Sequence, residues 1–159
     1  MLRLKIKVSI IFLLIFTTKV YSDDDISNCK GENHKNWNNC VGSVAIEGTA
    51  YVGHFKNGLY HGKGTFTFSD GATYVGNFEN GKESGFGTFI CWVHGAKYSG
   101  DFKNGKKHGN GKYNFPNGDV YEGEWENGKR EGEGIYTYFS GKKADKGLFK
   151  NNKFIGEKR

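Results

Sequence analysis

The sequence predicts an all-β protein built of tandem antiparallel β-hairpins. The chain of 159 residues holds 25 Gly and a single Pro beside 13 Phe, 9 Tyr and 3 Trp. Glycine weakens helices, whereas large aromatic rings suit the pleated surface of a strand. A motif of about 23 residues also recurs four times, and each copy contains Asn-Gly, the strongest short-range hairpin signal. Composition and repeat therefore both favour strands joined by tight turns.

The first 22 residues have the layout of a secretory signal peptide. Three basic residues are followed by an apolar run over residues 8–16 and by small residues that permit cleavage before Asp23. A membrane-spanning helix needs about 20 apolar residues, so this run is short for that role. We expect an exported protein, periplasmic or secreted, and an uncleaved segment acting as a membrane anchor is the alternative.

Removal of this segment changes the charge of the chain. Residues 1–22 carry four basic and no acidic residues, so the formal charge falls from +6 for the whole chain to +2 for residues 23–159. Nucleic-acid binding usually depends on a basic patch or stripe. A nearly neutral chain of mixed sign therefore does not predict a nucleic-acid partner.

The polar segment at residues 23–41 holds Cys29 and Cys40. Export permits disulfides, and the closeness of these two cysteines favours their pairing. Free or intermolecular thiols are the alternative, because a sequence does not fix connectivity. Cys91 remains unpaired in this scheme, and we expect it to fill the core position that Phe68 occupies in the first copy.

The remaining chain, residues 42–159, is predicted to be the repeat domain. A half repeat with a shorter turn is expected to precede four full copies, and a partial copy is expected to cap the end. The units are the half repeat at 42–50, the full repeats at 51–73, 74–97, 98–120 and 121–144, and the partial capping repeat at 145–159.

Each copy is predicted to form one hairpin. Its first strand places an aromatic residue, a glycine and a second aromatic residue at alternate positions, which share one face of a strand. Asn-Gly forms the turn, and the return strand again alternates glycines with rings. The positions that we expect to carry the fold are Tyr51, Gly53, Phe55, Gly62, Gly64, Tyr74, Gly76, Phe78, Gly85, Gly87, Tyr98, Gly100, Phe102, Gly109, Gly111, Tyr121, Gly123, Trp125, Gly132 and Gly134.

The shared parity of rings and glycines predicts how the hairpins pack. A ring from one hairpin can lie over a glycine of its neighbour, where an alanine methyl group would lift it. The alternative is that these glycines serve only the turns. One hairpin cannot bury three or four rings by itself, so neighbouring hairpins must stack to bury a continuous stripe.

The unit Y-x-G-x-[FW]-x-N-G-x-x-x-G-x-G-x-[FY], found over residues 42–156, resembles the MORN (membrane occupation and recognition nexus) repeat. The resemblance implies hairpins stacked into an elongated, twisted single-sheet ribbon with an aromatic face. It also implies roles in protein association, scaffolding and phospholipid binding. Asp145 stands where a Tyr would open a fifth copy, which supports a capping role for the last unit.

No pattern in the sequence predicts catalysis or a cofactor. Three segments match G-x-x-x-x-G-K but lack the following Ser or Thr and the strand-to-helix context of a phosphate-binding loop. His61 and His108 share a repeat position and are expected on surface turns, about 19 Å apart and too far for one zinc ion. Cys91 and His94 supply only two of the four ligands of a closed zinc site. We predict no enzyme, metal, cofactor or small-molecule substrate.

These observations favour a non-catalytic protein-interaction or scaffold module that acts outside the cytoplasm. Its partner is expected to be another protein or a second copy of the chain, with Tyr60, Trp92 and Tyr138 as exposed aromatic anchors. A carbohydrate binder or an enzyme that uses the aromatic stripe is a third hypothesis. The rings, however, recur at the alternate strand positions that face the core, which favours burial over ligand binding.

The alternative to a protein partner is peripheral binding to anionic phospholipid at a membrane surface. Such binding depends on basic residues gathered on one side of the molecule. The pairs proposed to line one edge are Lys106-Lys107, Lys129-Arg130 and Lys142-Lys143.

Overall fold

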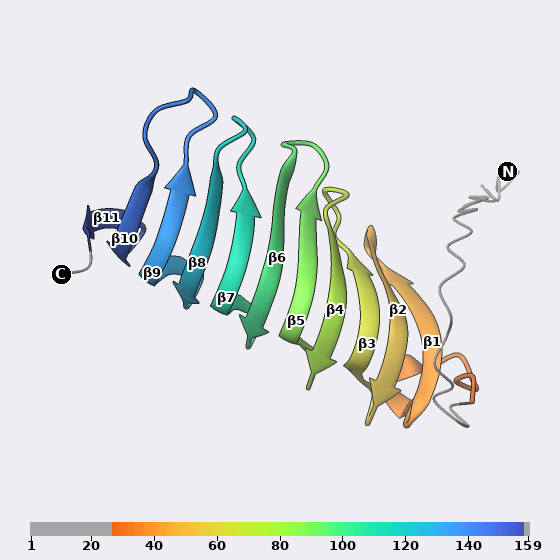
Figure 1. Cartoon of the computed structure of the whole chain (residues 1–159). Helices are drawn as coiled ribbons and strands as arrows, with labels where there is room; N and C mark the ends of the chain where they lie inside the picture. Colours follow the sequence, from red (N-terminus) through yellow and green to blue (C-terminus); the bar gives the residue numbers. More distant parts are fainter. Residues whose placement is uncertain (1–26, 158–159) are drawn as a thin grey trace, which may run out of the picture.

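The computed structural model describes residues 27–157, which form one open antiparallel sheet of eleven strands in sequential order (Figure 1). The predicted all-β ribbon of hairpins is confirmed, whereas the predicted signal segment lies outside the described residues. No helix in residues 27–157 is long and apolar enough to cross a membrane. The elements are η1 (a 3-10 helix, His34–Asn36), β1 (Cys40–Ile46), β2 (Thr49–Lys56), β3 (Leu59–Thr67), β4 (Thr73–Glu79), β5 (Lys82–Cys91), β6 (Ala96–Lys103), β7 (Lys106–Asn114), β8 (Val120–Glu126), β9 (Lys129–Thr137), β10 (Asp145–Lys150) and β11 (Lys153–Gly156).

The Asn-Gly turns and the longer loops between hairpins lie at opposite edges of the sheet (Figure 1). The turn between β2 and β3 is Asn57-Gly58, with φ of 52° and 73°. Positive φ at both central residues defines a type I′ turn, whose twist matches that of the strands it joins. The Asn-Gly turns of the next three hairpins have the same signs of φ. Longer loops join each hairpin to the next at the other edge.

The turn glycines also bind successive hairpins together. Gly81 N donates to the carbonyl oxygen of Tyr60 in the preceding hairpin (2.9 Å), and Gly105 N donates in the same way to Glu83 (2.9 Å). The backbone amide at the tip of each turn is thereby satisfied by the neighbouring hairpin rather than by solvent. The Asn-Gly motif therefore fixes the stacking of hairpins as well as their turns.

One face of the sheet carries the core, which is a continuous file of aromatic rings. Tyr51 meets Phe55 of its own strand edge-on, with ring centroids 5.2 Å apart, and Phe78 of the next hairpin at 5.0 Å. Aromatic pairs favour this edge-to-face arrangement, which adds to the gain from burial. The same pattern repeats along the ribbon, and the buried rings are Tyr51, Phe55, Tyr74, Phe78, Tyr98, Phe102, Tyr121, Trp125 and Phe149.

The tyrosine rings cover the glycines of their own hairpin, so the prediction that a ring covers a glycine of the neighbouring hairpin is wrong. Gly53 and Gly64 lie opposite each other in β2 and β3. A Cβ atom on Gly64 would lie 2.6 Å from Cε2 and Cζ of Tyr51, and one on Gly53 would lie 2.6 Å from the Cα of Gly64. The strand register shifts after Gly53, and the ring folds back over its own strand pair. Neighbouring hairpins instead meet through ring edges.

The tyrosine hydroxyl explains why the ring lies back over its own strand. Tyr51 Oη donates to the carbonyl oxygen of His54 (2.9 Å), and Tyr98 Oη donates to that of Asp101 (2.9 Å). A buried hydroxyl needs such a partner, because an unsatisfied one costs free energy. Burial raises the pKa of Tyr74 and of Tyr121 to about 12, so these hydroxyls stay protonated and able to donate.

Candidate interaction surfaces

The buried rings are overlaid by a second layer of half-buried rings, and together with two cations this layer forms what we call the ring face. These side chains pack against the core below and leave part of their surface in solvent. Phe115, for example, contacts Tyr113 at a centroid distance of 4.5 Å and Tyr136 at 5.3 Å. The half-buried rings of the ring face are Tyr60, Phe66, Phe68, Phe89, Tyr113, Phe115 and Tyr136.

One position of the ring face varies from hairpin to hairpin, and we call it the cover position. It is the second residue after the turn glycine, and it lies opposite the second buried ring of the hairpin. Paired residues of antiparallel strands share a face, so this side chain covers the core. The residues at the cover position are Tyr60, Glu83, Lys107 and Arg130.

In the first hairpin the cover position holds a third ring. Tyr60 stacks on Tyr51 with centroids 3.9 Å apart and an interplanar angle of 17°. This contact leaves Tyr60 half-buried, so the prediction of an exposed anchor at Tyr60 is wrong. Tyr138 is also half-buried, and its hydroxyl donates to Asp145. Of the three predicted anchors only Trp92, with 66% of its surface exposed, projects into solvent.

In the third and fourth hairpins the cover position holds a cation instead of a ring. Lys107 Nζ lies 4.1 Å from the ring centroid of Tyr113 and 5.1 Å from that of Trp125. Burial lowers the pKa of Lys107 to about 8, although the ring faces recover part of the lost hydration. The guanidinium carbon of Arg130 lies 5.0 Å from the Tyr136 centroid. Within residues 27–157 neither cation has a carboxylate at ion-pair distance.

These contacts separate the lysine pairs that the sequence placed on one edge. Lys106 and Lys129 are exposed beside the turns, whereas Lys107 and Arg130 fold onto the rings. Adjacent residues of a strand point to opposite faces, which is the physical reason for the separation. The ring-face position of Lys107 and Arg130 was not predicted from the sequence. Both residues stand at the same position after an Asn-Gly turn, the second after its glycine, and this constant spacing in the sequence could have identified the position.

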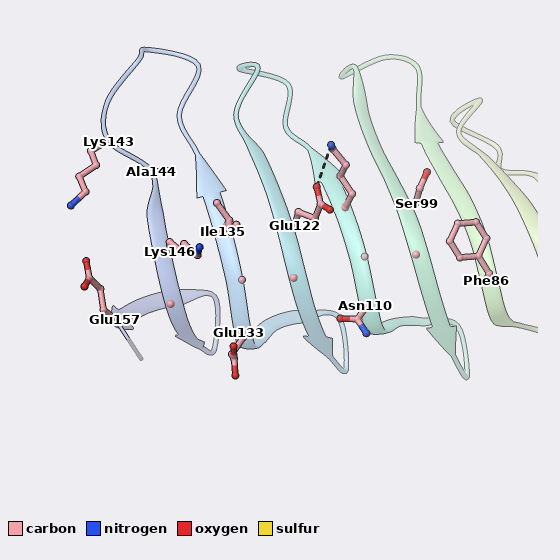
Figure 2. A pocket seen from close by; sticks show the side chains of 16 residues that line it. Phe86, Ser99, Asn110, Glu122, Glu133, Ile135, Lys143, Ala144, Lys146 and Glu157 are labelled. Carbon is pink, nitrogen blue, oxygen red and sulfur yellow. Dashed lines mark ion pairs between the residues drawn. The ribbon is translucent and has the colours of Figure 1, made fainter. Parts of the chain in front are cut away.

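The opposite face of the sheet carries a shallow groove that runs across the strands (Figure 2). Its larger stretch has a volume of about 970 Å³, and a second stretch of about 510 Å³ also reaches Phe86. The floor follows the backbone of the paired glycines, such as Gly100 and Gly111, whose Cα atoms face the Tyr98 ring on the other side of the sheet. Phe86 projects from β5 with 62% of its surface exposed.

The groove walls are polar and carry both signs of charge. Lys112 Nζ lies 3.3 Å from Glu122 Oε2, and Thr88 and Ser99 share a hydrogen bond of 3.0 Å. Figure 2 shows the labelled side chains of the groove, such as Ser99, Asn110 and Glu122, spread along the strands rather than converging on one point. The groove can accommodate an extended chain, but it holds no cluster suited to catalysis.

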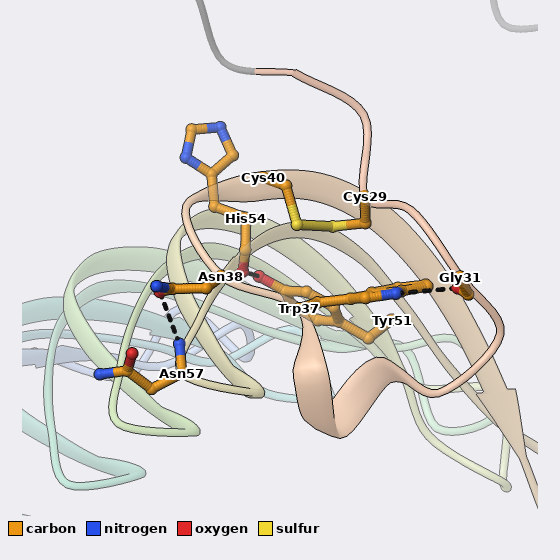
Figure 3. Close-up of a disulfide and its surroundings, with 8 residues drawn as sticks. All are labelled: Cys29, Gly31, Trp37, Asn38, Cys40, Tyr51, His54 and Asn57. Carbon is orange, nitrogen blue, oxygen red and sulfur yellow. Dashed lines mark hydrogen bonds between the residues drawn. A yellow bond between two sulfur atoms is a disulfide. The ribbon is translucent and has the colours of Figure 1, made fainter.

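The N-terminal end of the sheet is closed by the Cys29–Cys40 disulfide and Trp37 (Figure 3). The two cysteines have a Cα–Cα distance of 5.0 Å, which agrees with the predicted pairing. Trp37 meets Phe55 edge-on at 4.9 Å, and its indole nitrogen donates to the carbonyl oxygen of Gly31 (3.0 Å). A disulfide and a ring therefore cover the first β-strand at its core face.

This end imitates a repeat unit. A Cβ atom on Gly42 would lie 2.7 Å from Trp37 Cζ3 and 3.0 Å from Cys29 Sγ, so both groups stand where a tyrosine ring stands in a full copy. Gly58 N donates to the carbonyl oxygen of Trp37 (2.7 Å), as later turn glycines do to the cover position. An isolated parallel bridge joins Asn28 to β1. The bridge covers part of an edge that would otherwise be open to another strand.

The remaining candidate residues do not converge on a reactive centre. His61 and His108 lie half-buried on strands β3 and β7, so their predicted placement on surface turns is wrong. Cys91 is half-buried and unpaired, and its Sγ lies 3.1 Å from His94 Nδ1. The described part of the chain contains no group of three or more His, Cys, Asp or Glu residues placed to hold a metal ion.

Fold and surfaces together define a hairpin-repeat protein with a single open sheet and two different faces. The model of the MORN repeat matches four consecutive segments, residues 51–73, 74–91, 98–120 and 121–143, which make up more than half of the chain. The chain belongs to the MORN repeat family, as the resemblance in its sequence predicted. No curated protein matches it significantly.

Proposed function

We propose that the chain is a non-catalytic protein-interaction module whose partner binds the ring face. The observation that carries this proposal is the half-buried aromatic layer, into which Lys107 and Arg130 are set with no carboxylate of residues 27–157 at ion-pair distance. Protein interfaces are enriched in Tyr, Phe, Trp and Arg at their centres. MORN repeats are known in general for protein and membrane-lipid interaction, which is consistent with this role.

We further propose that the module acts outside the cytoplasm. The Cys29–Cys40 disulfide supports this location, because disulfides persist in oxidising compartments and are rare in the cytosol. The signal-peptide layout of residues 1–22 supports it independently. A second copy of the chain is the simplest partner, because each of two copies presents the same long ring face to the other.

The ring face can be tested with matched serine substitutions on the two faces. We expect Phe68→Ser combined with Phe115→Ser to abolish partner capture, because both rings lie on the ring face. Phe86→Ser removes an exposed ring from the opposite face and should leave capture intact. Capture from the extracellular or periplasmic fraction is quantified by mass spectrometry, and self-association by light scattering after size exclusion.

Circular dichroism and thermal unfolding must first show that all variants are folded. Equal capture by the two variants would remove the ring face from consideration. A strict monomer that captures no protein would contradict an interaction role altogether.

A further inference from the structure

Seven of the lysines lie in a row along one edge of the sheet. We define the turn edge as the ten residues that flank the five tight turns between β2 and β11. All ten are exposed, seven are lysines and two are glutamates. The residues of the turn edge are Lys56 and Leu59, Glu79 and Lys82, Lys103 and Lys106, Glu126 and Lys129, and Lys150 and Lys153.

This edge differs in charge from the rest of the molecule. The turn edge has a formal charge of +5, whereas the other described residues carry ten basic and twelve acidic side chains, a formal charge of −2. The low net charge of residues 23–159 therefore conceals a strong segregation. A row of one sign attracts an opposite charge much more strongly than the net charge indicates.

In the described part of the chain, the carboxylates on and next to this edge form no ion pairs with its lysines. Glu131 lies at the last turn, where its Oε2 accepts a hydrogen bond from Asn151 N (2.8 Å). Glu79 Oε2 accepts from Ser84 Oγ at 3.4 Å. At the neighbouring cover positions Glu83 is outnumbered by Lys107 and Arg130. No lysine of the turn edge forms an ion pair with a carboxylate of residues 27–157.

The cations form a line rather than a patch. Consecutive tight turns are two strands apart, about 10 Å, so five turns span roughly 40 Å. The density is greatest over the last three turns, which hold five of the seven lysines. Figure 1 shows the strand direction rotating from β1 to β10, so the row winds with the sheet. A flexible polymer chain can follow such a row along its whole length, whereas a flat membrane surface cannot.

We propose that the turn edge binds a linear polyanion, namely an acidic polysaccharide, whose anionic groups lie along the row of lysines. This inference goes beyond the interaction proposed for the ring face, because it concerns another surface and another class of partner. Interfacial membrane binding depends on apolar side chains as well as charge. The turn edge offers only Leu59, while Trp92, Val93 and Phe139 lie in loops at the opposite edge. Single-stranded nucleic acid binds by stacking on aromatic rings, and none of the ten residues is aromatic.

Heparin serves as the test polyanion for the purified full chain, with its disulfide kept oxidised. We expect retention on immobilised heparin and saturable binding of a size-defined heparin oligosaccharide, both weakened by salt. The triple variant Lys103→Gln, Lys106→Gln, Lys129→Gln should lose about tenfold or more in affinity. The matched control is Lys97→Gln, Lys112→Gln, Lys146→Gln, which makes the same charge change away from the tight turns, on the face of the sheet that carries the groove, and should lose much less.

Three results would overturn the proposal. Equal losses in the two triple variants would show that only net charge matters. Absence of heparin binding by the wild-type chain would remove the polyanion site directly. Binding to phosphatidylglycerol vesicles without binding to heparin would identify the edge as a membrane contact instead. None of these results depends on the ring face, so the proposed function is tested separately.

Discussion

At the scale of single residues, each repeat depends on a tyrosine that makes three contacts at once. Tyr98 is fully buried, its ring meets Phe102 and Trp125 edge-on, and its hydroxyl donates to the carbonyl oxygen of Asp101. The ring can reach all three partners only because it lies directly on the backbone of Gly100 and Gly111. The glycines are thus required by close approach, and this requirement is separate from that of the turns.

The substitution Gly111→Ala tests this close approach. A Cβ atom there would lie 2.5 Å from Cε2 and Cζ of Tyr98, and the φ of Gly111 is not positive, so the cost is a steric clash alone. We expect a loss of about 1 to 3 kcal/mol in the free energy of unfolding, as for other overpacked cores. Urea denaturation measures it, with Asn110→Ala at the exposed neighbouring position as control. A loss no greater than that of the control would show that the ring can move away from the glycine.

Lys107 makes a prediction about pH at the same scale. Burial lowers its pKa from 10.5 to about 8 in the folded chain. The unfolded chain therefore holds more protons between these two values, and the free energy of unfolding rises with pH across that window. The cost of burying the cation is fully present below pH 8 and disappears as pH approaches 10.5. The expected gain between pH 7 and pH 9.5 is on the order of 1 to 2 kcal/mol.

The comparison is with Lys107→Arg, because a guanidinium keeps its proton throughout this range. Arg130 shows that a guanidinium fits the cover position. Denaturant unfolding of both proteins from pH 7 to pH 9.5, below the ionisation of tyrosine, gives the difference at each pH. The wild-type chain should gain stability relative to the variant. Parallel curves would mean that Lys107 remains hydrated in the folded chain.

At the scale of elements, the strands and tight turns could be predicted because each is encoded locally. Asn-Gly determines the turn, and alternation of rings and glycines determines the face. The position of each tyrosine ring over the glycines of its own hairpin could not be predicted. Alternation along a strand predicts the face on which a ring lies, but not the direction in which the ring points across that face. That direction depends on the register shift after Gly53 and on the carbonyl group of His54, which are three-dimensional features.

The candidate surfaces were less predictable than the fold for the same reason. Lys106 and Lys107 are neighbours in the sequence, but Lys107 belongs to the ring face, where its ammonium group lies beside Tyr113 of its own hairpin and Trp125 of the next. The N-terminal cap gave a partial signal, since the pairing of Cys29 with Cys40 was expected. The position of Trp37 over Gly42 gave no signal in the sequence, because this tryptophan lies outside the repeat pattern.

At the scale of the whole molecule, the ribbon is a one-dimensional stack in which each hairpin contacts only its neighbours. The strand order is sequential throughout, and the contact between hairpins repeats almost unchanged: Tyr74 meets Phe102 at 4.8 Å, and Tyr98 meets Trp125 at 5.3 Å. Stability in such a stack is approximately a sum over units and their interfaces. Removing one complete unit should therefore shorten the protein without disrupting it.

Deletion of residues 98–120 tests this property. The deletion joins Lys97 to Tyr121, so β8 takes the place of β6 beside β5, and Tyr74 can meet Trp125 instead of Phe102. We expect a folded chain with β-sheet circular dichroism and a lower Tm, because one interface between hairpins is lost. Deletion of residues 98–105 removes most of β6 and its turn, so β7 would start at the loop edge, where β6 started, and every later strand would have to run opposite to its native direction. This shorter deletion should prevent folding although it removes fewer residues, whereas equal damage from both deletions would contradict an additive stack.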